Sequence, residues 1–404
     1  MKLTVGILAH VDAGKTTFSE RVLYEAHAIR SLGRVDHGDA FLDTHPIERQ
    51  RGITVFSGQA CIPLPGSDTL YWLDTPGHAD FSPEMERSLS VLDAAILIVS
   101  AAEGVQSHAE TVWSLLADYG IPTFIFLNKC DREGADQEAV LAECRALLSP
   151  EVLDLRSWQR AGSLDEALAE DIAGRDERLL ERYLDTGCEE ALWTEALRGM
   201  IAARQVFPLM SGAALQGEGV ASFMRLFTLL ARPLTPYDPE GSLKAKVFRV
   251  RHDRDGQRLC FMKLLSGTLR VKDELPQGKV NGLRIYHGER YREADRAEAG
   301  DLVAVPGLEG LRPGDTVGGT AERFRTEPMM AADLLWDRSA VPVFRMLEAV
   351  RQLEEEEPTL SAEQREDSIT VRVMGGIQLE ILKELMRERF GWAVDFGPCR
   401  VLYR

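Results

Sequence analysis

Short apolar runs alternate with amphipathic segments through residues 1–230 of the chain. The runs have the length of single strands and occupy residues 3–9, 70–74, 94–100, 123–128 and 206–210. The segments between them have helical spacing. This alternation predicts an α/β domain with a mostly parallel sheet and helices on both faces. Ligands bind at the carboxyl ends of such strands, so chemistry is expected there.

Three changes of pattern divide the chain further. Residues 132–205 are acidic and rich in Leu, Ala, Glu and Arg, which predicts helices inserted before the last strand of a domain over residues 1–236. The proline-rich stretch 231–242 indicates a linker. After it, alternating runs with glycine-rich turns predict a small β-barrel over residues 237–328.

Residues 329–404 are expected to form a small α+β domain that opens with a helix. The apolar face of this helix would consist of Met346, Leu347, Val350 and Leu353. The elements predicted after it are a strand over 368–374, a helix over 378–389 and a final strand over 393–403.

Composition narrows the class of protein. Hydrophobic residues make up 45% and charged residues 27% of the 404 residues, which suffices for ordinary globular cores. No apolar run reaches the roughly 18 residues of a membrane-spanning helix, and the apolar start leads into a loop rather than a cleavage site. The 6 cysteines form no CxxC pair, which disfavours zinc and redox sites and indicates a reducing cytoplasm. A net charge of −17 disfavours coating of nucleic acid, so DNA is not expected as a partner. Because no apolar run is long enough to span a bilayer, a membrane is not expected either.

The segment AHVDAGKT follows the first predicted strand and has P-loop spacing. Backbone N–H groups there, such as those of Ala13 and Gly14, would point at a phosphate, and the dipole of the next helix adds partial positive charge. Lys15 would bridge the β- and γ-phosphates, and Thr16 would place its hydroxyl on Mg²⁺. Ala9 stands where the pattern usually has glycine.

Two further segments fit the phosphate end of a nucleoside triphosphate site. In the RGIT segment, Thr54 would supply a second Mg²⁺ ligand when a γ-phosphate is present. In the DTPGH segment, Asp74 would hold Mg²⁺ through water, and the Gly77 N–H would bond the γ-phosphate. His78 would then lie beside the attacking water and act as the catalytic residue that orients it.

The NKCD segment, which contains Asn128 and Lys129, follows another predicted strand. Asp131 can accept hydrogen bonds from N1–H and the 2-amino group of guanine, whereas adenine has neither donor. A buried carboxylate without a partner is costly, so this segment favours GTP over ATP. An ATP-using P-loop enzyme is the alternative, and equal affinities for GDP and ADP would indicate it.

A last segment, formed by Gly212, Ala213 and Ala214, follows the final strand of the predicted sheet. A backbone N–H in this segment would bond O6 of guanine. Together these segments predict a site for GTP or GDP with Mg²⁺ as the metal ion.

With these segments placed, the chain resembles the translational GTPases of the elongation factor G class, and most of all the tetracycline-resistance ribosomal protection proteins. The matching segments are AHVDAGKTT (9–17), ERQRGIT (48–54), DTPGHADF (74–81), RSLSVLDAAILIVSAAEGVQ (87–106), FLNKCD (126–131), GDLVAVPGL (300–308) and ITVRVMGGIQLEIL (369–382). They extend over essentially the whole chain.

The resemblance implies a P-loop GTPase domain, a β-barrel and a ferredoxin-like α+β domain. It also implies that Asp12 and Thr17 belong to the phosphate site. Val11 and Ile53 would form an apolar gate that keeps His78 off the water until a ribosome docks. The ribosome is the implied transient partner, and a monomer is expected.

No segment of the chain matches the family's fourth and fifth domains. We expect that the chain is a truncated form, and a natural short paralogue is the alternative. Two functions remain open. A ribosome-dependent GTPase would use residues 36–54 and 77–90 as switch segments, whereas a nucleotide-dependent binding module would bind without turnover. Translocation and tetracycline protection are not separated, because the deciding residues would belong to the fourth domain.

Overall fold

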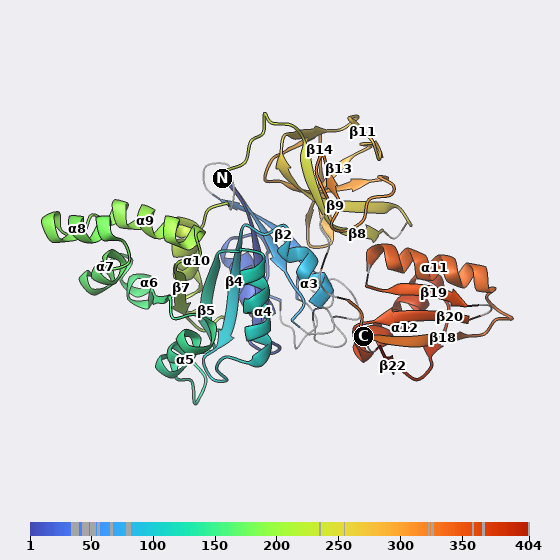
Figure 1. Cartoon of the computed structure of the whole chain (residues 1–404), viewed down its shortest axis with the longest axis horizontal. Helices are drawn as coiled ribbons and strands as arrows, with labels where there is room; N and C mark the ends of the chain where they lie inside the picture. The colour runs from blue at the N-terminus through green and yellow to red at the C-terminus, as the bar shows by residue number, and fades with distance from the viewer. Residues whose placement is uncertain are drawn as a thin grey trace. The chain divides into compact units, whose positions relative to one another are not determined.

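Figure 1 shows the whole chain in the computed structural model. The chain forms two compact units. The structure describes residues 1–33, 40–42, 48, 54, 57–64, 68–77, 82–233, 236–253, 255–321, 324, 327–357, 359–365 and 368–402. The first unit comprises Met1–Thr44, Gly58–Gly77 and Leu92–Pro236, and the second comprises His45–Ser57, His78–Val91 and Tyr237–Arg404. In the described parts of the chain, none of the helices has the length and apolar content that a membrane span requires.

The first unit is built on a seven-stranded sheet in the order β2-β3-β1-β4-β5-β7-β6. Its strands are β1 (Lys2–Ala9), β2 (Gly58–Leu64), β3 (Asp68–Asp74), β4 (Ala94–Ser100), β5 (Thr123–Asn128), β6 (Val152–Asp154) and β7 (Phe207–Ser211). Among these described strands, only the pairing of β2 with β3 is antiparallel. The predicted mostly parallel sheet is therefore confirmed, with two further strands, β2 and β6, that the sequence pattern did not indicate.

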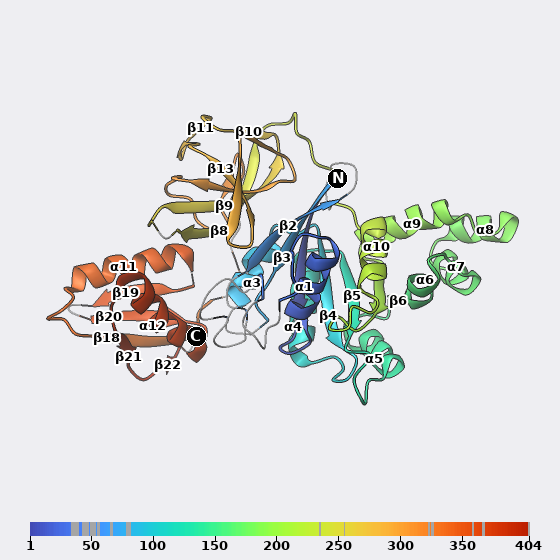
Figure 2. The same cartoon turned by 180° about the vertical axis from the view of Figure 1, so that it is seen from behind.

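Helices cover both faces of this sheet. On one face lie α1 (Lys15–Glu25) and α10 (Val220–Leu230), and on the other lies α4 (Ser107–Asp118), as Figures 1 and 2 show from opposite sides. Between β5 and β7 the chain forms mainly helices: α5 (Gln137–Glu143), a π-helical turn (Cys144–Leu148), α6 (Arg156–Ala161), α7 (Glu166–Ala173), α8 (Glu177–Thr186) and α9 (Glu190–Ala202).

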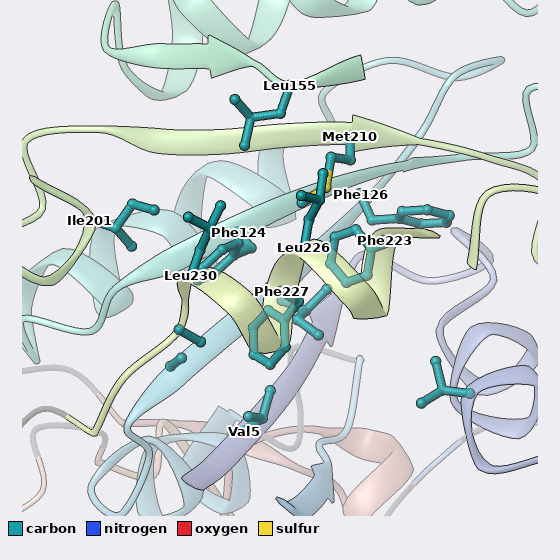
Figure 3. Close-up of a cluster of buried hydrophobic side chains, with 14 of the residues drawn as sticks. Val5, Phe124, Phe126, Leu155, Ile201, Met210, Phe223, Leu226, Phe227 and Leu230 are labelled. Atoms are coloured by element: carbon teal, nitrogen blue, oxygen red, sulfur yellow. The ribbon is translucent and has the colours of Figure 1, made fainter. Parts of the chain in front are cut away.

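The core on the α1 and α10 face contains a group of aromatic rings among aliphatic side chains, and Figure 3 shows those of Phe124, Phe126, Phe223 and Phe227. The ring of Phe126 lies 4.6 Å from that of Phe18 and 5.1 Å from that of Phe223, and all three side chains are fully buried. Such edge and tilted contacts add to the burial of apolar area. This packing fixes α1, and with it the loop before α1, against the sheet.

The second unit contains an antiparallel barrel and α3 (Ser82–Leu89). The main barrel sheet has the order β14-β13-β16-β9-β8-β17, and two-stranded pairs β10-β15 and β11-β12 complete it. Its strands are β8 (Lys244–His252), β9 (Arg258–Ser266), β10 (Thr268–Arg270), β11 (Glu274–Leu275), β12 (Gly278–Lys279), β13 (Leu283–His287), β14 (Arg290–Ala294), β15 (Arg296–Glu298), β16 (Leu302–Pro306) and β17 (Thr316–Val317).

The last part of the chain has the ferredoxin-like order of elements, βαββαβ. Its elements are β18 (Met330–Trp336), α11 (Val343–Glu356), β19 (Ser361–Arg365), β20 (Ser368–Val373), α12 (Gly376–Phe390), β21 (Val394–Phe396) and β22 (Arg400–Val401). The sheet runs β19-β20-β18-β21, and β22 also pairs with β18. The sequence prediction that this part opens with a helix was wrong, because β18 comes first. The single final strand was wrong too, since two short strands form there.

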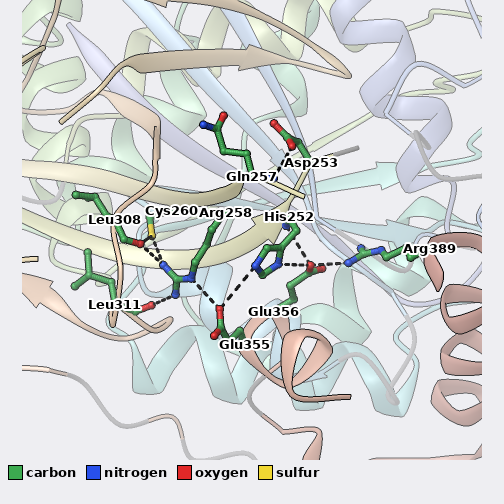
Figure 4. A network of polar contacts seen from close by, with 10 residues as sticks. All are labelled: His252, Asp253, Gln257, Arg258, Cys260, Leu308, Leu311, Glu355, Glu356 and Arg389. Atoms are coloured by element: carbon green, nitrogen blue, oxygen red, sulfur yellow. Dashed lines mark hydrogen bonds and ion pairs between the residues drawn. The ribbon is translucent and has the colours of Figure 1, made fainter. Parts of the chain in front are cut away.

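Two carboxylates at the end of α11 bind side chains of the β8–β9 hairpin of the barrel (Figure 4). Glu356 accepts hydrogen bonds from His252 Nδ1 (2.9 Å) and from Arg389 (2.6 Å), and Glu355 accepts one from Arg258 Nε (2.8 Å). Burial raises the pKa of Glu356, but the bonds from His252 and Arg389 outweigh burial and leave it below its usual range. These contacts lie wholly within the second unit.

A second buried polar cluster holds α3 in the same unit. Arg87 donates to both oxygens of Glu357 (2.8 and 2.7 Å) and to Glu84 (2.6 Å). Glu84 also accepts from the Ser57 N–H (3.2 Å), and Arg249 donates to the Ser57 carbonyl. Burial raises the pKa of Glu84, but Arg87 and Arg249 outweigh it and bring the pKa to about 2. The end of one predicted switch segment, residues 77–90, is thus bonded to the end of α11, and Ser57, three residues after the other segment, is bonded to the barrel.

Replacing Phe223 by alanine should lower the free energy of unfolding by about 3–5 kcal/mol, because a fully buried ring is lost and a cavity is left. The matched control is Leu184→Ala in the same unit, where the side chain is 77% exposed and the change should stay within about 0.5 kcal/mol. Urea denaturation followed by fluorescence measures both. Equal losses in the two variants would contradict the assigned core.

Glu84→Gln should destabilise the protein at neutral pH by about 3 kcal/mol, because Arg87 and Arg249 lose a buried countercharge. The pKa of Glu84 is lowered on folding, so its stabilisation is fully present above a pH of about 4.5 and is lost as the pH falls toward about 2. Denaturation midpoints measured across this range should therefore fall more steeply for the wild type than for Glu84→Gln. The exposed Glu348 provides the control, Glu348→Gln, which should follow the wild type. Parallel curves for Glu84→Gln and wild type would rule this role out.

Candidate nucleotide-binding site

The loop between β1 and α1 curls at the carboxyl edge of the sheet. Its Ala13 N–H donates to the His10 carbonyl (3.3 Å), and Asp12 and Gly14 have φ angles of 64° and 92°. A side chain at Gly14 would be strained at this φ and would collide with the amide of Asn128. Loops of this kind turn backbone N–H groups inward at the start of a helix, where they bind phosphate. The structure thus gives residues 9–16 the strand, loop and helix that the P-loop pattern predicts.

The side chain of Asn128 joins three loops. Its Nδ2 donates to the Ala13 carbonyl (2.9 Å), and its Oδ1 accepts from the Ala214 N–H (2.9 Å). Asn128 stands at the end of β5 and is 3% exposed, so both bonds are shielded from water. Arg21 of α1 adds a bond to the Leu215 carbonyl (2.8 Å). Hydrogen bonds therefore hold the loops after β1, β5 and β7 together at the carboxyl end of the sheet.

Asp74, at the end of β3, lies opposite the first turn of α1. Its Oδ2 forms an ion pair with Lys15, and its Oδ1 accepts a hydrogen bond from the Ser19 hydroxyl (2.8 Å). Asp74 is fully buried and Lys15 is 8% exposed. A buried ion pair must be well bonded to offset the loss of hydration, and here both carboxylate oxygens have donors. The predicted phosphate lysine and the predicted metal-site carboxylate are thus in direct contact.

The part of the site that is predicted to hold the guanine base is more exposed to solvent. Asp131 is exposed, and the neighbouring Lys129 has a φ of 62° and an ion pair with Glu103 (3.0 Å). Gly212 packs so closely that a Cβ would meet the Glu218 carbonyl and the Phe126 ring. The Ala213 N–H donates to that same carbonyl (2.9 Å). Backbone bonds therefore shape the segment after β7, and its side chains play little part.

The structure does not test the predicted roles of several residues. Ile53 and His78 lie outside the described residues. Thr54 is buried and belongs to the second unit, whereas Val11 is 45% exposed in the loop before α1. The predicted gate and the predicted catalytic histidine therefore stay predictions. Thr16, Thr17 and Gly77 lie at the expected edge, half-buried.

Three residues of α1 contribute to the site without having been predicted: Ser19, Glu20 and Arg21. Glu20 accepts backbone hydrogen bonds from Gly33 (3.0 Å) and Phe41 (2.7 Å), and burial raises its pKa. Ser19 and Glu20 could have been noticed in the sequence because each is a polar residue on a helix face that is otherwise apolar. Their partners are distant in sequence, so the pattern could not name them.

The residues at this edge fit a hard cation. Mg²⁺ prefers oxygen ligands and keeps several waters, so a carboxylate, a hydroxyl and phosphate oxygens suffice for it. The buried carboxylate of Asp74 and the hydroxyl of Thr16, in the first turn of α1, are of this kind. Among the described residues, no group of three or more His, Cys, Asp or Glu side chains could hold a metal ion by itself.

Comparison with known proteins agrees with this geometry. Residues 2–233 match the family described as the elongation factor Tu GTP binding domain, and residues 242–319 match elongation factor G domain 2. An oxytetracycline resistance protein of Streptomyces rimosus is 34% identical, over 99% of this chain and 66% of its own length. Elongation factor G 1 of Geobacter sulfurreducens is 30% identical, over 99% of this chain and 68% of its own length.

A crystal structure of a protein from Thermus thermophilus has a TM-score of 0.87 and 26% identity, over 98% of this chain and 67% of that one. The chain spans about two thirds of the length of these relatives (66% of the resistance protein). The matches extend over the sheet domain, the barrel and the ferredoxin-like part. The chain therefore belongs to the translational GTPase family, in the elongation factor G class that includes the tetracycline resistance proteins.

Proposed function

We propose that the protein binds Mg²⁺·GTP at the carboxyl edge of the sheet and hydrolyses it to GDP and phosphate when docked on a ribosome. The observation that carries the proposal is the side chain of Asn128, which ties the loop of Ala13 to the loop of Ala214. Such a tie holds a phosphate loop and a base loop at a fixed separation. Membership of the family supports GTP as the nucleotide.

At the phosphate end, Lys15 would exchange its ion pair with Asp74 for the β- and γ-phosphates. Backbone N–H groups of Asp12, Ala13 and Gly14 and of the first turn of α1, which includes Thr16 and Thr17, would bond the phosphate oxygens. The Gly77 N–H would reach the γ-phosphate. Mg²⁺, held by Thr16, Thr54 and, through water, Asp74, would neutralise charge on the transferred group.

At the base end, Asp131 would accept from N1–H and the 2-amino group of guanine, and the stem of Lys129 would lie along the base. The segment of Gly212, Ala213 and Ala214 would offer O6 a backbone N–H. The family usually has serine where this chain has Ala213. This change leaves the backbone donor in place, so guanine binding is expected to survive it.

Hydrolysis would depend on His78, which would orient water beside the γ-phosphate. Val11 and Ile53 would keep His78 away from that water until the ribosome moves the switch segments. Intrinsic turnover is then slow. The relatives include an elongation factor and an oxytetracycline resistance protein, so the work done on the ribosome would be of one of these two kinds.

Asp131→Asn tests the base assignment. An asparagine presents an N–H₂ donor toward position 2 of the base, where xanthine has a carbonyl and guanine an amino group. The variant should therefore lose at least about 100-fold in GDP affinity and gain affinity for xanthosine diphosphate, because the bound base would cover this exposed side chain and a covered, mismatched donor or acceptor is costly. Competition binding measures both, with exposed Asp118→Asn as the control. Unchanged preference for GDP would refute the role of Asp131.

His78→Ala tests the catalytic assignment. GTP turnover stimulated by 70S ribosomes should fall by about 10²–10³-fold, whereas GTP affinity should change less than about twofold, since the side chain acts only on the attacking water. Equal stimulated rates in variant and wild type would overturn the role of His78. If the wild type binds both GTP and ribosomes but ribosomes never stimulate its turnover, the binding-module alternative is correct.

A further inference from the structure

We infer that Ser19 and Trp72 are positioning residues that orient the carboxylate of Asp74 toward the magnesium ion. This inference rests on the proposed function. The indole N–H of Trp72 donates to the Ser19 hydroxyl oxygen (3.1 Å), and that hydroxyl donates to Asp74 Oδ1 (2.8 Å). All three side chains are buried within the first unit, with exposed fractions of 0%.

The sequence spacing explains why these groups meet. Trp72 and Asp74 are two residues apart on β3, so both point to the same face of the sheet. Lys15 and Ser19 are four residues apart on α1, so they share the helix face turned toward β3. The two pairs form a small ladder in which Lys15 meets one oxygen of Asp74 and Ser19 meets the other.

The two carboxylate oxygens of Asp74 therefore have different roles in the proposed site. If Lys15 turned to the phosphates of a bound nucleotide, Oδ2 would be released and would be available to the hydrated metal ion. Oδ1 keeps its bond to Ser19, which fixes the plane of the carboxylate. Without that bond the carboxylate could rotate, and its affinity for Mg²⁺ would fall. Hydrogen-bond partners behind a metal-site residue commonly matter in this way, because they orient it.

Trp72 completes the arrangement by directing the Ser19 hydroxyl. A helical serine can turn its hydroxyl back to the carbonyl four residues earlier, which here belongs to Lys15. The indole N–H donates to Ser19 Oγ, so the hydroxyl hydrogen remains available for Asp74, and bonds in such a chain strengthen one another. Phe18 stacks near the Trp72 ring, with centroids 6.1 Å apart, and holds it in place.

A purely structural role would be simpler: Ser19 would only satisfy a buried indole N–H. The two roles differ in what they do to magnesium. Loss of a structural bond weakens the fold and nucleotide binding with or without Mg²⁺. Loss of a positioning bond changes the Mg²⁺ requirement alone.

The test is the release of a fluorescent GDP analogue from the 404-residue chain as a function of free Mg²⁺. In Ser19→Ala, the Mg²⁺ concentration that half-maximally slows release should rise about tenfold, the low end for a residue behind a metal site. Release in EDTA should change less than about twofold. Trp72→Phe, which keeps the ring packing and removes only the N–H, should shift the Mg²⁺ midpoint by about threefold in the same direction.

The matched control is Thr123→Val, which removes another fully buried hydroxyl, at the start of β5 and so at the opposite edge of the sheet. It should leave the Mg²⁺ midpoint unchanged. Adding Mg²⁺ to the GDP complex should also change indole emission in the wild type, and this change should disappear in Trp72→Phe.

Equal Mg²⁺ midpoints in wild type, Ser19→Ala and Trp72→Phe would overturn the inference and leave the proposed function intact. Faster release in EDTA by the same factor as in Mg²⁺ would also overturn it, in favour of the structural role. If Ser19→Ala does not fold, Trp72→Phe alone decides between these outcomes. A wild-type chain that retains no GDP at any Mg²⁺ concentration would overturn the proposed function and this inference together.

Discussion

The amide of Asn128 is the contact on which the candidate site depends. It is buried at the end of β5, and its two ends bond the Ala13 carbonyl and the Ala214 N–H. Each bond uses a backbone group that would otherwise be left without a partner beside the sheet, where an unpaired polar group is costly. One side chain thereby sets the distance between the loop proposed to bind phosphate and the loop proposed to bind the base. The aromatic core under α1 and α10 keeps both loops from moving apart.

The two ends of the proposed site, one for the base and one for the phosphates, differ in how firmly they are held. The base end is framed by backbone bonds and by the close packing of Gly212, so it should be ready before a nucleotide arrives. The phosphate end contains the ion pair of Lys15 and Asp74, which can be exchanged. Helix α3, within the second predicted switch segment, and Ser57, just after the first, belong to the second unit. A change in those segments would therefore reach the barrel and α11 through Arg87, Arg249 and Glu357.

Much of the fold and of the site was predictable from the sequence. Strands β4 and β5 were predicted within their observed bounds, because runs of Ile, Val, Leu and Phe between turn residues admit little else. In contrast, β18 reads MAADLLW, and its Met, Ala and Leu favour helix, so pairing with β20 overrides local preference there. Edge strand β2, with Gln, Cys and Pro, lacked a strand pattern.

The predicted motif segments that the structure describes each follow a strand of the sheet, at its carboxyl end. Their positions could be inferred for this reason. Ser19, Glu20 and Arg21 were missed because their partners are brought to α1 by folding alone. Ser19 meets a carboxylate on β3, Glu20 meets two backbone groups at Gly33 and Phe41, and Arg21 meets the segment after β7. No local spacing connects these residues. Periodicity predicts which face of a helix is buried. It does not predict which polar groups will become hydrogen-bond partners on that face.

The most direct test of the account is a calorimetric titration of the chain with GDP and, separately, with ADP, both with Mg²⁺. The edge built from Asn128, Asp131 and the segment after β7 should bind GDP at least about 100-fold more tightly than ADP, because adenine would leave the Asp131 carboxylate unpaired. Equal affinities for the two nucleotides would contradict the claim that this edge is a guanine nucleotide site.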